Sequence, residues 1–299
     1  MTNTVTVIGL GAMGLPMATN LAQDFKVNGV DIAEARLALA KAAGISTFSN
    51  SQEAVAEADV VLLAVRNQQQ LNDVLFGKLG ISHMMKEGAA ILLTSTVGIA
   101  AVVEAAQRLK SDNIEIIDAP VSGGPVRAGE GDLLVTVGAY PEVVDKFRDV
   151  LEKMAGNLVI VGDEPGKGQA MKTVNQLLCG VHIAAAGEAM ALAGKLGLDQ
   201  KAALDALMSG AASSFMLGDR GKRMLEAYTD EGAEVKSRVD IFVKDMGIVT
   251  AAAKDAGIAV PVAAAAEQQY LQGLARGMGA DDDSSIIRVV SPSDPTREV

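Results

Sequence analysis

A short glycine-rich segment near the N-terminus places the strongest constraint on the fold of this chain. In "VTVIGLGAMGLPMATNL", a G-x-G-x-x-G pattern directly follows a strand-like run and opens a helical pattern. The first glycine permits a tight turn, the second lets the backbone approach a pyrophosphate, and the third lets a helix pack closely on a strand. The segment therefore predicts a dinucleotide site at Gly9, Gly11, Ala12, Met13 and Gly14. The alternative is a glycine-rich turn that binds no ligand.

Asp31 ends the next strand-like run, "FKVNGVD", and bears on the choice of cofactor. A carboxylate at this place can accept hydrogen bonds from the adenosine ribose hydroxyls, and it would repel the 2′-phosphate of NADP. Arg36 lies about one helical turn further on and could in principle bind that phosphate. Asp31 could also cap the following helix. This reasoning favours NAD over NADP.

The first half of the chain alternates strand-like and helical segments. Near-continuous apolar runs suit strands that are covered on both faces, as in a parallel sheet. The runs are "TVTVIGL", "FKVNGVD", "ADVVLLAV", "AAILLTST", "IEIIDAPV", "DLLVTVG" and "NLVIVG". Helical patterns such as "IAAVVEAAQRLK" lie between several of them. The pattern predicts an α/β, Rossmann-type doubly wound parallel sheet over residues 1–163.

After "GDEPGKG" (162–168) the strand-like runs stop and Ala-rich helical periodicity begins. We expect an all-helical C-terminal domain over residues 164–299, with a frayed tail at "SPSDPTREV". The expected helices cover 167–195, 199–210, 213–226, 238–257 and 261–276.

Composition limits the partners and the location. The net charge of −11 disfavours nucleic acid and anionic membranes as partners. The apolar N-terminus lacks the basic start of a signal peptide, since Lys26 is the first basic residue, and the apolar run at 256–266 is broken by Pro261. A single cysteine, Cys179, fits a reducing compartment. The sequence predicts a soluble, cytoplasmic protein.

Several kinds of dehydrogenase chemistry are disfavoured by the residues available. Of the two histidines, His83 lies in a surface-like segment and His182 has no acidic neighbour in sequence to orient it. No Cys/His cluster has zinc-ligand spacing, so we expect no metal. Cys179 suits a small core residue. The absence of a Tyr-x-x-x-Lys pair argues against the short-chain dehydrogenase mechanism.

Lys172 is the remaining candidate for proton transfer. It stands on a long apolar helical segment, with Asn175 and Gln176 at i+3 and i+4 on the same face and no further charge until Glu188. A desolvated lysine can lose its proton near neutral pH and exchange it with a hydroxyl. Asn175 and Gln176 could hold substrate hydroxyls. The alternative is a lysine that snorkels to the surface of an amphipathic helix.

Four motifs in order resemble the β-hydroxyacid dehydrogenases, whose members include 3-hydroxyisobutyrate dehydrogenase and tartronate semialdehyde reductase. The motifs are "GLGAMGLPMATNL", "DAPVSGGPVRAGEGDLLVTVG", "GKGQAMKTVNQL" and "KDMGIV", and they span most of the chain. The resemblance implies a Rossmann-type domain followed by a helical domain, with the active site in a cleft between them. It also implies a small hydroxy-acid substrate and a homodimer or homotetramer.

The resemblance assigns roles residue by residue. It implies that Lys172 is the catalytic base and that Asn175, with Gln176 beside it, binds substrate. The turn Ser122-Gly123-Gly124 resembles the segment that holds the substrate carboxylate, and glycine turns do expose backbone N–H donors. Thr96 and Lys244 match positions beside the cofactor, and Asp245 accompanies Lys244. Without the resemblance, Lys244 and Asp245 would be a solvated helix pair.

The segment after the third predicted strand departs from the family pattern. Where many members have a proline in a "MLP"-like stretch, this chain has Val65, Arg66 and Asn67, and Val65 is assigned to the cofactor site. That segment, with 175–193, 239–249 and 281–290, most resembles the threonate dehydrogenase branch. It implies oxidation of a four-carbon sugar acid, L-threonate, at C2. The alternatives are 3-hydroxyisobutyrate, tartronate semialdehyde in the reducing direction, or a nucleotide sensor without catalysis on the same fold.

Overall fold

Residues 3–296 are described by a computed structural model, in which the chain divides after Lys172 into two units. Unit 1 runs to Lys172 and unit 2 starts at Thr173, and each is described by itself. The division predicted from the sequence, after residue 163, comes just before helix α9 (Lys167–Lys195), which carries the chain from unit 1 into unit 2.

Unit 1 is built on a mixed sheet whose strand order is β3-β2-β1-β4-β5-β6-β8-β7, with β9 beside β8. The six strands from β3 to β6 are parallel, whereas β8 runs antiparallel to β6 and β7 and parallel to β9. The strands are β1 (Thr4–Ile8), β2 (Lys26–Val30), β3 (Ser46–Phe48), β4 (Val60–Leu63), β5 (Ala90–Leu93), β6 (Glu115–Asp118), β7 (Val121–Ser122), β8 (Leu133–Gly138) and β9 (Ala155–Gly162).

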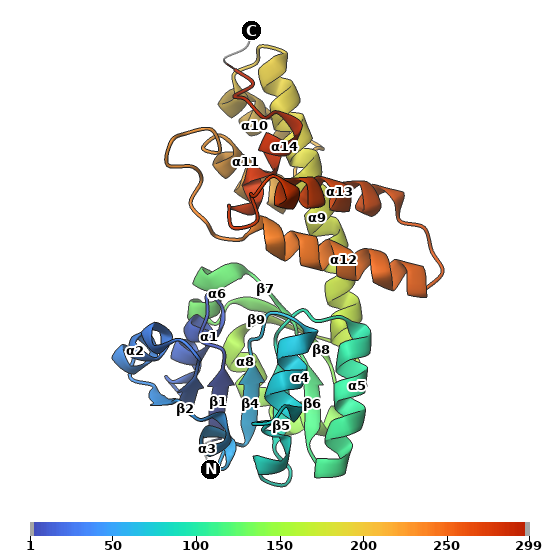
Figure 1. The fold of residues 1–299 in the computed structure, drawn as a ribbon. Helices are drawn as coiled ribbons and strands as arrows, with labels where there is room; N and C mark the ends of the chain where they lie inside the picture. The colour runs from blue at the N-terminus through green and yellow to red at the C-terminus, as the bar shows by residue number, and fades with distance from the viewer. Residues whose placement is uncertain (1–2, 297–299) are drawn as a thin grey trace. The chain divides into compact units, whose positions relative to one another are not determined.

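Each parallel strand of the sheet centre buries both faces, as its continuous apolar sequence predicts. In β4, Val60 and Leu62 pack into one core and Val61 and Leu63 into the other. Helices α1, α7 and α8 cover the first core and α3, α4 and α5 the second, with α4 and α5 in front of the sheet in Figure 1. The helices of unit 1 are α1 (Gly14–Leu21), α2 (Glu34–Ala42), α3 (Ser51–Val55), α4 (Gln68–Phe76), α5 (Ile99–Leu109), α6 (Gly124–Glu130), α7 (Pro141–Lys146) and α8 (Arg148–Met154), with short 3₁₀ turns η1 (Ser82–Met84) and η2 (Lys110–Asp112).

The last residues of five parallel strands lie side by side. Ile8 is in register with Val30 and Leu63, Leu63 with Leu93, and Leu93 with Asp118. The loops that follow these residues therefore leave the sheet along one line, which we call the carboxyl edge. In open α/β sheets this edge is where ligands bind.

Up to residue 296, the secondary structure of unit 2 is helical, as predicted, apart from one isolated bridge between Arg238 and Asp282. Its helices follow the expected ranges closely: beyond α9 they are α10 (Gln200–Met208), α11 (Phe215–Met224), α12 (Val239–Asp255) and α13 (Pro261–Ala275), and then η3 (Asp283–Ile286) and α14 (Ile287–Val290). The core is centred on Phe242 and Tyr270, whose rings stack with centroids 5.3 Å apart. Tyr270 is fully buried and donates from Oη to the carbonyl of Gly180 at 2.9 Å.

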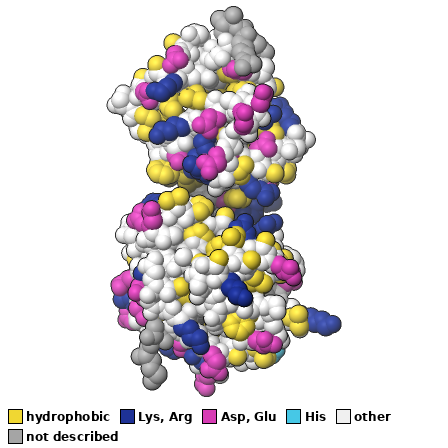
Figure 2. Space-filling model, turned by 90° about the vertical axis from the view of Figure 1, so that its left-hand side faces the viewer, with side chains coloured by type: hydrophobic (Ala, Val, Ile, Leu, Met, Phe, Trp, Pro, Cys, Tyr) yellow, Lys and Arg dark blue, Asp and Glu magenta, His cyan; other side chains and the backbone are white. Residues whose placement is uncertain are grey.

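The expectation of a frayed tail is wrong for the residues that the structure describes. The described part of the tail, 291–296, is not frayed: Tyr228 donates to the carbonyl of Ser291 at 2.6 Å, and a Cβ on Gly194 would lie 2.9 Å from Pro295. Residues 297–299 lie outside the described chain. Helix α9 is also long and apolar enough to cross a membrane by length and composition, although 56% of that apolar window is buried inside the structure, as in core helices of globular proteins. Acidic and basic side chains are interspersed with apolar ones on the face drawn in Figure 2.

Candidate active site

The three glycines of the N-terminal loop serve different purposes. Gly9 has φ +95°, and a Cβ there would lie 2.4 Å from the carbonyl oxygen of Ala64. A Cβ on Gly14 would lie 1.7 Å from the carbonyl oxygen of Gly9, so close packing of α1 on the turn requires glycine. Gly11 has no protein atom within 4 Å of such a Cβ. Internal packing does not explain Gly11, and the open space above its backbone fits the close approach of a dinucleotide pyrophosphate.

Asp31 is tied to this loop. Its Oδ2 accepts from the N–H of Leu10 at 2.7 Å, and its Oδ1 accepts from the N–H of Ala33 at 2.8 Å, immediately before α2. Asp31 thus fixes the turn before α2, but the N-cap of that helix is Ala33 and no side chain caps it, so the expected capping role is wrong. Each carboxylate oxygen can accept a further hydrogen bond, so a ribose hydroxyl can be bound at the same time. Arg36 is exposed on α2.

The loops after β4 and β5 are joined to each other. The N–H of Val65 donates to Oγ of Ser95 at 2.7 Å, and Oγ1 of Thr94 donates to the carbonyl of Leu63 at 3.0 Å. Val65 and Thr96, both predicted to border the cofactor, thus lie on two connected loops of the carboxyl edge.

The turn Ser122-Gly123-Gly124 follows β6 at the same edge. Gly123 has φ +147° and Gly124 has φ +79°, which are conformations that residues with a side chain rarely adopt. Ser122 is half-buried in β7, where it pairs with Leu134, and Gly123 beside it is exposed. The two glycines let the backbone turn sharply between β7 and α6. A Cβ on Gly123 would lie 2.9 Å from Leu133, whereas Gly124 has open space where a ligand could approach.

Lys172 lies in the second turn of α9 and is buried, with only 8% of its surface exposed. The start of α9 is fixed to the carboxyl edge. Gln169, one turn before Lys172, accepts from the N–H groups of Val97 and Gly98 at 2.9 and 3.1 Å. The structure therefore holds the turn before the lysine against the loop that contains Thr96.

In unit 2 the predicted residues form a chain of polar contacts. Asn175 donates from Nδ2 to Oε1 of Gln176 at 2.9 Å, and Gln176 donates from Nε2 to Oδ2 of Asp245 at 2.6 Å. Lys244 pairs with Oδ1 of Asp245 at 2.9 Å. Gln176 is buried and its amide is engaged at both ends, which suits a residue that orients Asn175. Cys179 accepts a weak hydrogen bond from Asn175 at 3.4 Å.

The predicted site residues are thus divided between the units. Unit 1 gathers the glycine loop, Asp31, Val65, Thr96, Ser122-Gly123-Gly124 and Lys172 at its carboxyl edge, and unit 2 holds Asn175, Gln176 and Lys244. His83 is exposed and His182 is half-buried. Asn67 caps α4 by accepting from the N–H of Gln70 at 2.9 Å, so its side chain has a structural task.

Comparison with known proteins identifies the family of the chain. Residues 4–162 match the NAD binding domain of 6-phosphogluconate dehydrogenase, and residues 166–290 match the NAD-binding domain of NADP-dependent 3-hydroxyisobutyrate dehydrogenase. The chain belongs to the β-hydroxyacid dehydrogenase family.

The relatives are similar over nearly the whole chain. L-threonate dehydrogenase of Escherichia coli K12 is 36% identical over 290 residues, which cover 96% of this chain and 94% of the relative. L-threonate dehydrogenase of Cupriavidus necator is 36% identical over 291 residues, covering 97% and 96%. The crystal structure of 3-hydroxyisobutyrate dehydrogenase from Salmonella typhimurium is 34% identical with a TM-score of 0.88, covering 96% and 99%. This β-hydroxyacid dehydrogenase is an NAD-dependent enzyme that acts on a small hydroxy acid, and its Rossmann-type fold with a helical C-terminal region is confirmed.

Two residues of the dehydrogenase site were not singled out from the sequence. Asp118 and Gln169 are both fully buried, and they connect three segments of the carboxyl edge. Each lies inside a motif that carries the resemblance, "DAPVSGG" and "GKGQAMK". The sequence did contain a signal for Asp118, a carboxylate at the end of a buried apolar strand. A buried charge needs hydrogen-bond partners, so such a residue is expected to bind other segments of the chain.

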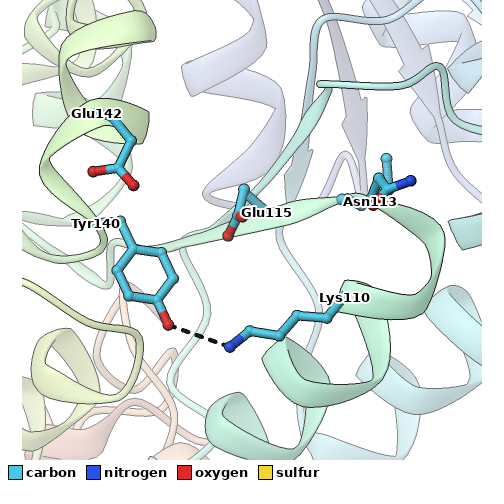
Figure 3. A pocket seen from close by; sticks show the side chains of 6 residues that line it. Lys110, Asn113, Glu115, Tyr140 and Glu142 are labelled. Carbon is cyan, nitrogen blue, oxygen red and sulfur yellow. Dashed lines mark hydrogen bonds between the residues drawn. The ribbon is translucent and has the colours of Figure 1, made fainter.

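A separate cavity lies at the opposite edge of the sheet. Its volume is about 400 Å³, and its lining includes Lys110, Glu115 and Tyr140 (Figure 3). Glu115 begins β6, so this cavity is at the amino ends of the strands. Lys110 donates to Oη of Tyr140 at 3.5 Å. It is distinct from the dehydrogenase site, since the glycine loop, Thr96 and Lys172 are at the carboxyl edge.

Proposed function

We propose that the chain oxidises the C2 hydroxyl of a four-carbon sugar acid, best represented by L-threonate, to the 2-oxo acid with NAD as acceptor. The observation that carries the proposal is the buried Lys172, whose helical turn is bonded through Gln169 to the loop that contains Thr96. A base held beside a nicotinamide loop is what alcohol oxidation requires.

The residues divide the work of the reaction. Bound NAD supplies the acceptor for the hydride that leaves the carbinol carbon. Nζ of Lys172 takes the hydroxyl proton as the C–O bond becomes a carbonyl. Backbone N–H groups of the Ser122-Gly123-Gly124 turn, with the Ser122 hydroxyl, hold the substrate carboxylate. Asn175, oriented by Gln176, aligns the reacting end one turn along α9 from the lysine.

The cofactor choice follows from Asp31. Its carboxylate stands at the end of β2 against the glycine loop, where it would meet the adenosine ribose and oppose a 2′-phosphate. The resemblance also assigns cofactor-binding roles to Val65 and Thr96 on the loops of unit 1, and to Lys244 on α12 of unit 2. We also propose a cytoplasmic location and a homodimer or homotetramer, in line with the composition and the family.

The substrate is tested by a panel that gives threonate, erythronate, glycerate and 3-hydroxyisobutyrate to the enzyme with NAD and with NADP. We expect the highest kcat/KM for L-threonate with NAD. Relatives named L-threonate dehydrogenase support this expectation. A tenfold preference for 3-hydroxyisobutyrate would overturn the substrate and leave the role of Lys172 intact.

The catalytic assignment is tested by Lys172→Met. We expect kcat to fall by about 10²–10⁴-fold, the range for loss of a general acid–base, with the NAD dissociation constant unchanged. The matched control is Lys167→Met, which removes a half-exposed lysine from the start of the same helix, where it pairs with Glu164. A near-normal kcat for Lys172→Met would remove this lysine from the mechanism.

A further inference from the structure

A buried pair of side chains, Asp118 and Gln169, joins the start of α9 to the sheet. Both have no exposed surface. Nε2 of Gln169 donates to Oδ1 of Asp118 at 2.9 Å and to the carbonyl of Ser95 at 3.0 Å, while its Oε1 accepts from the N–H groups of Val97 and Gly98. One amide thus binds the backbone on both sides of Thr96.

Asp118 fixes the other side of the connection. Its Oδ2 accepts from the N–H of Gly166 at 2.9 Å and from the N–H of Gln169 at 2.8 Å, at the point where α9 begins. The helix also sits directly on the strand end, since a Cβ on Gly168 would lie 2.4 Å from the carbonyl oxygen of Asp118. Burial raises the pKa of Asp118, and the hydrogen bonds from Gln169, Gly166 and Gly168 oppose that rise.

The hydrogen bonds of Gln169 and Asp118 connect the Thr96 loop, assigned to the cofactor, with the helical turn before Lys172, the proposed base. Thr96 lies between the three backbone groups that Gln169 binds. Lys172 follows Gln169 by three residues, about one helical turn along the same face of α9. The connection between them is short and stiff, because each of its contacts is a direct hydrogen bond and all but the one from the half-buried Gly98 join buried groups.

We propose that Gln169, oriented by Asp118, is a positioning residue that sets the distance between the Thr96 loop and Lys172, and thereby the alignment of hydride and proton transfer. The inference rests on the proposed function of Lys172. Gln169 touches neither substrate nor cofactor in this role. Its amide is suited to the task because it must accept from two N–H groups and donate to a carboxylate and a carbonyl, which glutamate and aliphatic residues cannot do.

The proposal can be tested by exchanging the carboxylate and the amide between positions 118 and 169, which reverses the direction of their hydrogen bond. Gln169→Glu places a second carboxylate against Asp118 and removes the donor, and Asp118→Asn places an amide nitrogen against Nε2 of Gln169. When both substitutions are combined, the new amide at position 118 can donate to the new carboxylate at position 169, whose other oxygen still accepts from Val97 and Gly98. We expect each single variant to lose about 10²-fold in kcat, as small misplacements do, and the double variant to recover about tenfold of it.

Three readouts separate positioning from mere stability. The variants are compared for kcat, for the NAD dissociation constant, and for the deuterium isotope effect on kcat/KM with substrate deuterated at the reacting carbon. We expect a lower kcat, a larger isotope effect because hydride transfer becomes more rate-limiting, and unchanged NAD binding. Gln169→Met, of similar length and without charge, provides a second single variant if Gln169→Glu folds poorly.

The matched control is Asn28→Asp, the same amide-to-acid change in a buried residue of unit 1. Asn28, in the middle of β2, donates from Nδ2 to the carbonyl of Ala54 at 3.2 Å. We expect it to lower the melting temperature and to leave kcat and the isotope effect alone. If Gln169→Glu and Gln169→Met keep the wild-type kcat and isotope effect while Lys172→Met is inactive, the positioning role is wrong. An active Lys172→Met would instead overturn the catalytic role of Lys172 on which this inference rests.

Discussion

At the scale of single residues, glycine is required for different physical reasons at neighbouring positions of the N-terminal loop. Gly14 is required by packing, because a Cβ would meet the Gly9 carbonyl oxygen at 1.7 Å. Gly11 has open space around the same imagined atom, and its φ is not positive. Packing inside the protein thus explains Gly14 and does not explain Gly11, where the open space fits a bound pyrophosphate.

This difference predicts opposite outcomes for two alanine variants. Gly11→Ala should keep the wild-type melting temperature and weaken NAD binding about tenfold, which corresponds to about 1.4 kcal/mol, because its methyl group occupies the pyrophosphate space. Gly14→Ala should lower the free energy of unfolding by about 1–3 kcal/mol or more through overpacking. Thermal unfolding without NAD and calorimetric titration with NAD measure both. A Gly11→Ala variant that binds NAD normally would contradict the assignment of the loop.

The sequence indicated most of the candidate site but not the residues that connect it. Lys172 stood out because it was an isolated charge on an apolar helix, and the glycine loop because its spacing has a mechanical meaning. Gln169 gave no such signal. A glutamine is common on helix surfaces, and its hydrogen bonds to Val97 and Gly98 join residues more than seventy positions apart, which local patterns do not contain.

At the scale of elements, apolar runs predicted seven strands, and all seven are present. The strands that were missed are β3 and β7, with three and two residues, which are too short to show a pattern. The sequence predicted a parallel sheet, but β8 runs antiparallel to β6 and β7. Composition does not reveal this, because a strand buried on both faces has the same composition whether it runs parallel or antiparallel. The helices of unit 2 were predicted well since several have clear starts: Asp199 accepts from the N–H of Ala202 and Ser214 from the N–H of Leu217.

The position of the short 3₁₀ turn η3 is fixed by ion pairs rather than by the helix propensity of its residues. Asp282 precedes it and accepts from Nε of Arg223 at 2.9 Å and from the N–H of Lys236 at 2.9 Å. The next residue, Asp283, pairs with Arg220 at 2.9 Å. These ion pairs attach η3 to α11. Although burial acts to raise the pKa of Asp282, hydrogen bonds from Ser284, Arg223 and Lys236 bring it below its ordinary value of 3.8.

The sign of that shift predicts a pH dependence. Because the pKa is lower in the folded state, the ionised carboxylate stabilises the fold above pH 3.8, and the stabilisation is lost as the pH falls through the folded value. Asp282→Asn should therefore cost about 1.5–3 kcal/mol at pH 7, and less at about pH 3. Urea unfolding at both pH values measures this. Asp281→Asn is the control: it removes a half-exposed neighbour that pairs with Arg288 at 3.6 Å, and should change stability by less than about 1 kcal/mol. An equal cost for Asp282→Asn at the two pH values would contradict the ionic role.

At the scale of the whole molecule, net charge opposes the association of two copies of the chain, whereas exposed apolar surface favours it. A net charge of −11 makes copies of the chain repel one another. Unit 2 nevertheless exposes large apolar side chains near the end of α9 and at the start of α13, with Leu192 at 59%, Leu196 at 67% and Val262 at 64% exposure. Apolar surface of this kind marks association sites when it forms a continuous patch.

We therefore expect a homodimer or homotetramer in which the apolar side chains of unit 2 are buried. Light scattering after size-exclusion chromatography should give two or four times the chain mass of 30.8 kDa. Leu192→Glu should shift the distribution toward the monomer, since stable interfaces bury about 1,200–2,000 Å² in total and a charge in an apolar interface is costly. Leu79→Glu changes a side chain in unit 1 that is 70% exposed, and should leave the mass unchanged. If the wild-type chain has the monomer mass at micromolar concentration, the exposed apolar side chains do not form a self-association surface. If Leu192→Glu and Leu79→Glu lower the mass equally, the assignment of the interface to unit 2 is wrong.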